Sequence, residues 1–190
     1  MARREISQIA GLILVEPKKF GDHRGFFSET YNRERMAALG FSAEFIQDNH
    51  ALSGEAGTLR GVHYQSPPFA QDKLVRVARG RILDVAVDIR KGSPTYGDHA
   101  AVELSAENWR QLLVPAGFGH GYLTLEPGTE VIYKVTQPYA PVNDHGFLWS
   151  DPEVAIDWGF DPEALILSDK DRVLPRLAEI DSPFVWEGAA

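Results

Sequence analysis

The chain has 190 residues, 44% of them hydrophobic, and a formal net charge of -8 at pH 7. This length predicts a single domain over residues 1–190, with enough chain to bury a core. The acidic balance argues against nucleic-acid binding, which depends on many lysine and arginine contacts to phosphates. No apolar run approaches the roughly 18 residues that a membrane span needs, so we expect no membrane partner.

Two further features indicate where the protein works. The chain has no cysteine, which excludes disulfides and thiolate chemistry. Its first residues, Met1 to Glu5, lack the apolar core of a secretory signal peptide. We therefore expect a cytoplasmic protein.

The first part of the chain predicts short strands and one helix. An apolar run from Leu12 to Val15 indicates an extended segment. Glycines then flank a charged turn, and the aromatic-rich stretch 26–31 that follows predicts a strand. From Asn32 to Leu39 we expect a short helix, because asparagine is a good N-cap and Gly40 follows the last residue. The polar run 47–50 is either a hydrogen-bonding patch or a loop.

The clearest strand is the stretch from Arg81 to Arg90. Apolar residues alternate there with small or charged ones, as in a strand with one buried face. Lys73 to Ala78 is also strand-like, and Arg79-Gly80 separates the two stretches. A short turn between two strands predicts a β-hairpin.

More strands are expected at 99–104, 111–114 and 129–137. In the last of these, Tyr133 shares one face with its valine neighbours two residues away on either side. Many short strands with little helix predict an all-β sandwich or barrel. A jelly roll fits best, because such barrels hold small ligands between their sheets.

Two other segments are less regular. Three glycines surround His120, and they either let the backbone approach a ligand or form a tight sheet corner. Beyond residue 143 the chain is punctuated by prolines, and Trp149 and Trp158 are expected to anchor it by packing.

The stretch Thr58 to Gln65 combines Arg60, which grips phosphate or carboxylate, with His63, which exchanges protons near neutral pH. A lone histidine in a strand is more often structural, so this stretch alone does not decide function. In a regular strand the two side chains point to opposite faces. Both line one cleft only if Gly61 bends or bulges the strand, which we expect.

Two chemistries compete for these residues. A metal site needs several converging ligands, yet His63 has no second histidine two residues on, and His120 has no partner nearby. The sequence therefore favours metal-free proton transfer next to a carbonyl. His63 is then the base, Lys73 the cation that stabilises the enolate, and Tyr133 the acid. A carboxylate is expected to orient the imidazole, but the residues alone do not say which.

Five motifs in unbroken order carry a resemblance to a known family. They are FGDHRGFFSE at 20–29, QDN at 47–49, LRGVHYQ at 59–65, PAGFGHG at 115–121 and LSDKD at 167–171. Over about residues 6–184 the chain resembles the dTDP-4-dehydrorhamnose 3,5-epimerase family. The resemblance implies a cupin-like jelly-roll barrel, a double-stranded β-helix with a few short helices.

The resemblance also implies an isomerase activity that needs no cofactor. Such enzymes invert C3 and C5 of dTDP-4-dehydro-6-deoxy-D-glucose, in the pathway to dTDP-L-rhamnose. By this analogy His63 is the base with Asp171 as its dyad partner, Tyr133 is the acid, and Lys73 faces the ketone oxygen. The expected dTDP-sugar contacts are Arg24, Glu29, Gln47, Asp48, Asn49, Arg60, His120, Tyr139, Asp144 and Lys170. The family implies a homodimer that exchanges an N-terminal strand.

The sequence departs from the family in small ways. Asp144 stands where many relatives have Glu, and Val62 stands where Leu is common. Related functions share nearly every motif, namely an epimerase that inverts C3 or C5 alone and a ketoisomerase on a related dTDP-keto-deoxysugar. A metal-dependent cupin and a non-catalytic nucleotide-sugar binder are more distant alternatives.

Overall fold

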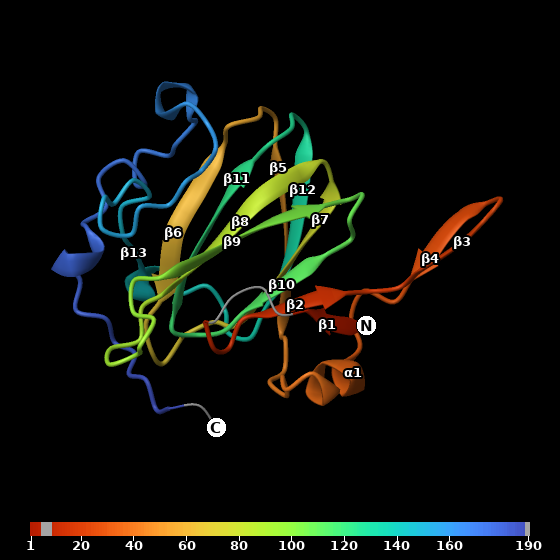
Figure 1. Cartoon of the computed structure of the whole chain (residues 1–190), viewed down its shortest axis with the longest axis horizontal. Coiled ribbons are helices and arrows are strands. Elements are labelled where there is room, and N and C mark those ends of the chain that lie inside the picture. Colours follow the sequence, from red (N-terminus) through yellow and green to blue (C-terminus); the bar gives the residue numbers. More distant parts are fainter. Residues whose placement is uncertain (5–8, 189–190) are drawn as a thin grey trace.

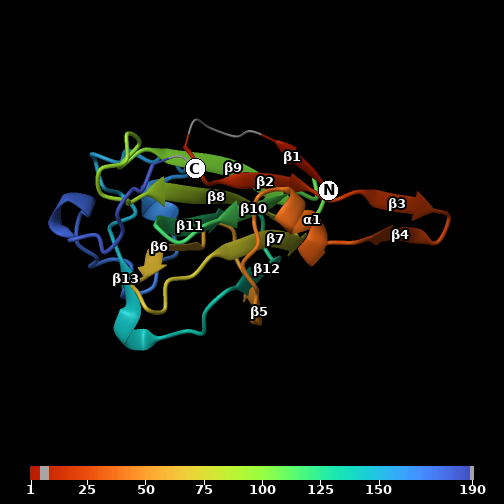
Figure 2. The same cartoon turned by 90° about the horizontal axis from the view of Figure 1, so that it is seen from below.

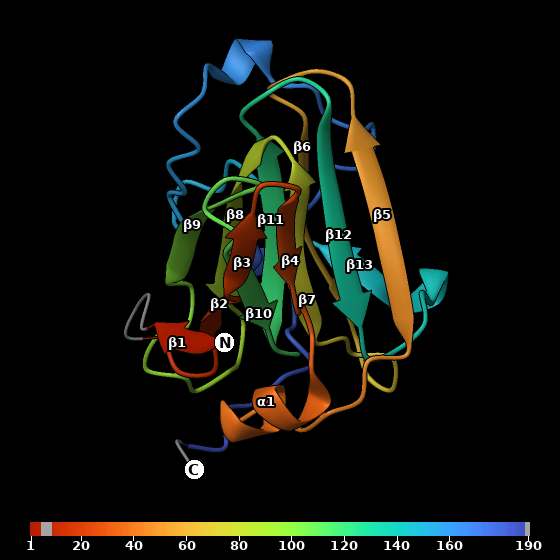
Figure 3. The same cartoon turned by 90° about the vertical axis from the view of Figure 1, so that its right-hand side faces the viewer.

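The computed structural model describes residues 1–4 and 9–188, and they form mostly strands in two packed sheets (Figure 1). The six-stranded sheet has the order β1 (Ala2–Arg4), β2 (Ile13–Glu16), β10 (Gln111–Val114), β7 (Lys73–Arg79), β12 (Thr129–Val135) and β5 (Gln47–Ser53). The five-stranded sheet has the order β13 (Asp144–Gly146), β6 (Leu59–Gln65), β11 (Phe118–Thr124), β8 (Arg81–Asp88) and β9 (His99–Ser105). The two sheets lie face to face (Figure 3). The all-β jelly-roll prediction is confirmed.

Helical structure is sparse. The helix α1 (Arg33–Ala38) begins after Asn32, whose Oδ1 accepts a hydrogen bond from the Arg35 amide at 3.0 Å, so the predicted helix and its cap are confirmed. Three single 3-10 turns follow late in the chain, η1 (Pro141–Asn143), η2 (Pro162–Ala164) and η3 (Leu177–Glu179). Within residues 1–4 and 9–188, no helix has both the length and the apolarity to cross a bilayer. The single-domain expectation for residues 1–190 stays a prediction.

The predicted hairpin of β7 and β8 is wrong, although both strands exist. β7 pairs with β10 and β12, whereas β8 pairs with β11 and β9 in the other sheet. The chain crosses between sheets at Gly80, which has a φ of +74°. Both faces of β8 are buried, and Asp84 and Asp88 are fully inaccessible to solvent. The alternating residues of β8 thus point to two different buried faces, and neither face is exposed to solvent.

Those two faces belong to different cores. One lies between the sheets and includes Val75, Ile82 and Leu112. The other lies on the outer face of the five-stranded sheet, where the irregular C-terminal segment covers it with Phe147 and Trp158. The Trp158 indole Nε1 donates a hydrogen bond to the carbonyl of Trp149 at 2.9 Å. This contact and their packing against the outer core confirm the two tryptophans as packing anchors.

The glycines around His120 serve strand packing. This stretch is the fully buried strand β11, in which a Cβ at Gly119 would lie 2.6 Å from the Phe147 ring. A Cβ at Gly121 would lie 3.0 Å from the carbonyl oxygen of Arg60 on β6. The backbone approach that these glycines permit is therefore to neighbouring protein segments. Since 118–124 is one continuous strand, the sheet corner is wrong, and the approach to a ligand stays a prediction.

A two-stranded hairpin, β3 (Lys19–Asp22) and β4 (Gly25–Ser28), projects from the body of the molecule (Figures 1 and 2). The strand predicted at 26–31 thus ends at Ser28. Phe26 and Phe27 on this hairpin are 55% and 71% exposed. Exposed aromatic side chains that lie together on a surface are a feature of interaction sites.

Candidate active site

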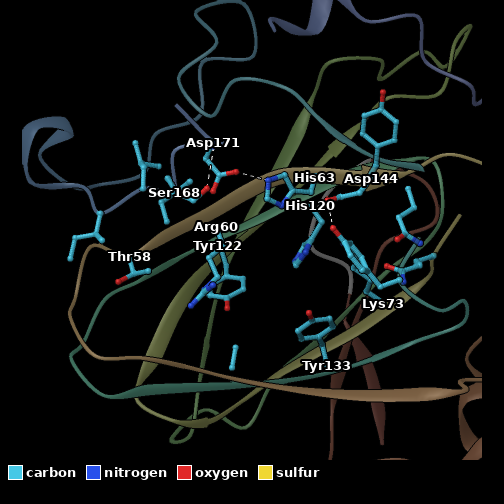
Figure 4. Close-up of a pocket in the computed structure, with 18 residues that line it drawn as sticks. Thr58, Arg60, His63, Lys73, His120, Tyr122, Tyr133, Asp144, Ser168 and Asp171 are labelled. Carbon is cyan, nitrogen blue, oxygen red and sulfur yellow. Dashed lines mark hydrogen bonds and ion pairs between the residues drawn. The ribbon is translucent and has the colours of Figure 1, made fainter. Parts of the chain in front are cut away.

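A cavity of about 540 Å³ lies between the sheets, and charged and aromatic side chains line it (Figure 4). Strands β6 and β11 supply one wall, with Arg60, His63, His120 and Tyr122. Strands β7 and β12 supply the facing wall, with Lys73 and Tyr133. The remaining lining residues are Ala51, Thr58, Leu59, Tyr64, Gln65, Gln71, Tyr139, Asp144, Ile166, Leu167, Ser168 and Asp171.

A bulge in β6 brings Arg60 and His63 to the same cavity. His63 pairs with His120 and Arg60 pairs with Tyr122, so three steps along β6 match two along β11. The extra residue lies at Gly61, which has a φ of +128°. A Cβ there would lie only 2.5 Å from Cα of Gly121, so only glycine fits. The expected bulge is confirmed.

His63 is held by a buried carboxylate. Its Nε2 lies 2.6 Å from Oδ1 of Asp171, whose side chain is 4% exposed. Burial raises the pKa of Asp171, but the hydrogen bond from His63 and its charge outweigh burial. Together with hydrogen bonds from Ser168 and the Gly61 amide, they hold the pKa of Asp171 below its usual range. Asp171 is therefore ionised at neutral pH. It fixes the ring and leaves Nδ1 as the nitrogen without this partner.

Lys73 supplies a positive charge on the opposite wall. Burial lowers the pKa of its ammonium to about 8, although Asp144 and Asp84 raise it. The group is thus mostly charged at neutral pH and loses its proton more easily than an exposed lysine. Such a cation can stabilise negative charge that develops on a nearby oxygen.

Tyr133 lies across the cavity from His63 (Figure 4). Burial raises the pKa of its phenol, while Arg60 lowers it. The phenol is therefore protonated at neutral pH and available as a donor. The two side chains face one shared space from opposite sheets, which is the arrangement that proton removal from one side and return from the other requires.

A second histidine–carboxylate pair lies beside the first. His120 Nε2 is 2.8 Å from Oδ1 of Asp84, and the two side chains are 9% and 0% exposed. Oδ2 of Asp84 is buried and, among the residues described, has no hydrogen-bond partner. Asp84 was not predicted from the sequence as a site residue. The only feature of the sequence that could have indicated Asp84 is its charge within the apolar strand predicted at 81–90.

The mouth of the cavity carries Tyr139 and Asp144. Oδ2 of Asp144 accepts hydrogen bonds from the Tyr139 hydroxyl at 3.1 Å and from the Lys170 ammonium at 2.5 Å. Tyr139 is 62% exposed, so its ring is open to a ligand. Lys170 lies at the rim, in an adjoining groove outside the cavity itself.

Six predicted contacts do not line this cavity, namely Lys170 at its rim and five residues farther away. Arg24 is at the tip of the projecting hairpin, where it bonds to Asp22 at 2.6 Å, and Glu29 bonds to Arg35 at 3.1 Å. Gln47, Asp48 and Asn49 begin strand β5, so the loop alternative for 47–50 is wrong. The hydrogen-bonding patch is confirmed, because the Gln47 amide donates to Oδ1 of Asn49 at 2.8 Å and Lys134 donates to Asp48 at 2.8 Å. Register pairs Asn49 with Tyr133, so Asn49 lies on the face of the sheet that bears the cavity.

No set of three or more His, Asp or Glu side chains within residues 1–4 and 9–188 is grouped to hold a metal ion. The cavity lining offers imidazole, ammonium, phenol and guanidinium groups for a ligand. Together they suit an anionic substrate that carries an exchangeable proton.

Comparison with known proteins gives a consistent result. A family model described as dTDP-4-dehydrorhamnose 3,5-epimerase matches residues 6–179. A protein of that name from Sinorhizobium fredii is 48% identical over 184 residues, covering 94% of this chain and 91% of the relative. A Bacillus anthracis structure of that name, with TDP and pyrophosphate bound, is 50% identical with a TM-score of 0.88, covering 92% of this chain and 99% of the other. A Legionella pneumophila dTDP-6-deoxy-D-glucose-3,5-epimerase in complex with dTDP-4-keto-L-rhamnose is 43% identical with a TM-score of 0.91, covering 96% and 97%.

Proposed function

Because the chain belongs to the dTDP-4-dehydrorhamnose 3,5-epimerase family, we propose that it inverts C3 and C5 of dTDP-4-dehydro-6-deoxy-D-glucose. The product is dTDP-4-dehydro-L-rhamnose, so the protein is an isomerase of dTDP-rhamnose biosynthesis. The observation that carries this proposal is the placement of His63 and Tyr133 on facing walls of one cavity. Both carbons flank the C4 ketone, so one proton-transfer chemistry serves both centres.

Each inversion begins with loss of a proton from carbon. Nδ1 of His63 takes the proton, and Asp171, 2.6 Å from Nε2, stabilises the imidazolium that forms. The electron pair moves into the ketone and generates an enolate, whose oxygen the Lys73 ammonium stabilises. Tyr133 then donates its proton to the opposite face of the carbon, and both side chains return to their starting states by exchange with solvent. The reaction balances without an oxidant or reductant.

The remaining cavity residues bind the nucleotide part. Arg60 and His120 on the β6–β11 wall suit the diphosphate, since both can donate to its oxygens. Tyr139 at the mouth offers an exposed ring on which the thymine base can stack. Asp144 and Lys170, which bond to each other, complete this rim.

The contacts that lie away from the cavity support a homodimer. Arg24 and Glu29 are on or beside the projecting hairpin, and Phe26 and Phe27 expose apolar surface there. We infer that this hairpin reaches a second copy and brings Arg24 and Glu29 to that copy's cavity, near Gln47, Asp48 and Asn49. Mixing Arg24→Ala with His63→Asn tests this. Each variant alone should be inactive, and mixed dimers should regain up to about a quarter of the activity. No recovery in subunits shown to have exchanged contradicts the shared site.

The cytoplasmic location expected from the sequence stays a prediction, which fractionation of cells that produce the protein checks. The proposed reaction itself is tested in heavy water with dTDP-4-keto-6-deoxy-D-glucose. Deuterium should enter at C3 and at C5. Exchange at one carbon alone favours the mono-epimerase, and exchange at neither carbon overturns the proposal.

A further inference from the structure

Among the tyrosines that line the cavity is Tyr122, to which the proposed mechanism gives no role. Tyr122 lies on β11, two residues beyond His120 and directly opposite Arg60 on β6. It lines the cavity, and Figure 4 shows it beside Arg60, on the wall that faces Tyr133. A substrate held between the walls therefore meets a phenol from each side.

The ring and the hydroxyl of Tyr122 have different surroundings. The ring belongs to the core between the sheets, and the residue is only 6% exposed. Buried tyrosine hydroxyls usually find a hydrogen-bond partner. The Tyr122 hydroxyl makes no hydrogen bond to any other described residue, although it borders the cavity. Phenylalanine would fill the same core position, so the hydroxyl is not needed for packing.

The charge environment makes this hydroxyl a donor. Burial raises the pKa of Tyr122 to about 12, Arg60 lowers it, and Tyr133 and Asp84 raise it. The proton therefore stays on the phenol throughout the neutral range. A neutral phenol can donate a hydrogen bond to a sugar oxygen, but it does not act as a base there.

Because one base acts on two carbons, such a donor can affect which carbon loses its proton faster. C3 and C5 lie on either side of the C4 ketone, so the sugar must present each in turn to His63. A hydrogen bond from a fixed position stabilises one of these two poses more than the other. We propose that the Tyr122 hydroxyl donates a hydrogen bond to the sugar and thereby determines the balance between proton exchange at C3 and at C5. This inference rests on the proposed function.

Tyr122→Phe tests the inference, because it keeps the ring and removes only the hydroxyl. The measurement is the rate of deuterium incorporation at C3 and at C5, with the affinity for dTDP as a second readout. The ratio of the two rates should change by about fivefold, the effect of one neutral hydrogen bond. The affinity for dTDP, which lacks the sugar, should stay within about twofold.

A matched control is Tyr96→Phe, which removes a phenol hydroxyl outside the cavity and should leave the ratio unchanged. A smaller amount of folded enzyme lowers the exchange rates at C3 and at C5 by the same factor, so their ratio does not change. An unchanged ratio in Tyr122→Phe, whether the rates hold or fall together, overturns the inference and leaves Tyr122 as a packing residue. Failure of the proposed function looks different, because the unaltered protein then shows no exchange at one or both carbons.

Discussion

Two histidine–carboxylate pairs lie on neighbouring strands, and their histidines are cross-strand partners. His63 with Asp171 and His120 with Asp84 have similar geometry, at 2.6 and 2.8 Å. Their surroundings differ, because the side chain of His63 is 27% exposed to the cavity and that of His120 only 9%. An imidazole that must collect and release protons needs access to both substrate and solvent, whereas one that only binds a ligand needs access to the ligand alone. This difference is consistent with the proposed roles, catalysis for His63 and ligand binding for His120.

The largest effect is expected from replacing the two histidines separately. His63→Asn removes the base and should lower kcat by at least about a hundredfold to ten-thousandfold. Binding of dTDP should stay within several-fold, because the diphosphate contacts remain. His120→Asn should instead weaken dTDP binding by about tenfold and leave kcat within about tenfold. Steady-state kinetics with calorimetric dTDP titration checks both. Equal losses of binding and turnover in the two variants would remove the distinction between the pairs.

A smaller effect concerns Lys73, which lines the same cavity as both histidines. Its pKa of about 8 means that the ammonium loses its charge as the pH rises through 8. If that charge stabilises the enolate, kcat/KM should fall about tenfold for each further pH unit. Lys73→Arg should be less active near neutral pH but should not show this decline, because a guanidinium stays charged. A profile that is flat from pH 8 to 10 in the unaltered protein would assign Lys73 another role.

The smallest effect is on stability. The pKa of Asp171 is lower in the folded protein than in the unfolded chain, so its ionised form stabilises the fold above about pH 4. This contribution is lost as the pH falls through the folded-state pKa. Asp171→Asn should therefore lower the free energy of unfolding by about 1–2 kcal/mol at pH 7, and the difference should shrink below pH 4.

Denaturant unfolding at pH 7 and pH 3 measures this difference. Asp169→Asn is the matched control, because Asp169 is an exposed neighbour on the same turn. A stability loss of the same size at both pH values would show that the ionised form of Asp171 contributes nothing to folding.

The sequence alone predicted the site residues whose role depends on their own side-chain chemistry. His63, Lys73 and Tyr133 were predicted from their proton-transfer capacity, and the bulge at Gly61 followed from the need to turn Arg60 and His63 to one cleft. Their catalytic roles stay predictions. The fold class followed from many short strands with little helix.

Contacts between residues far apart in the sequence could not be predicted from the local sequence pattern. Asp171 is 108 residues from His63 along the chain, so only the family resemblance indicated their pairing. The crossing from β7 to β8 was mistaken for a hairpin, because a buried strand alternates whether its second face meets solvent or another core. Asp84 and Tyr122 were not predicted for the same reason. The local pattern places each in a strand, but it does not show that the facing sheet leaves a cavity beside it.

The central claim is that protons leave the sugar toward His63 and return from Tyr133, and Tyr133→Phe in heavy water tests it most directly. Removal of the phenol should leave deuterium exchange at the carbon that His63 deprotonates, with retained configuration, while inversion falls at least about a hundredfold. His63→Asn, measured alongside, should show neither exchange nor inversion. Inversion that persists in Tyr133→Phe, or exchange that persists in His63→Asn, would contradict the account.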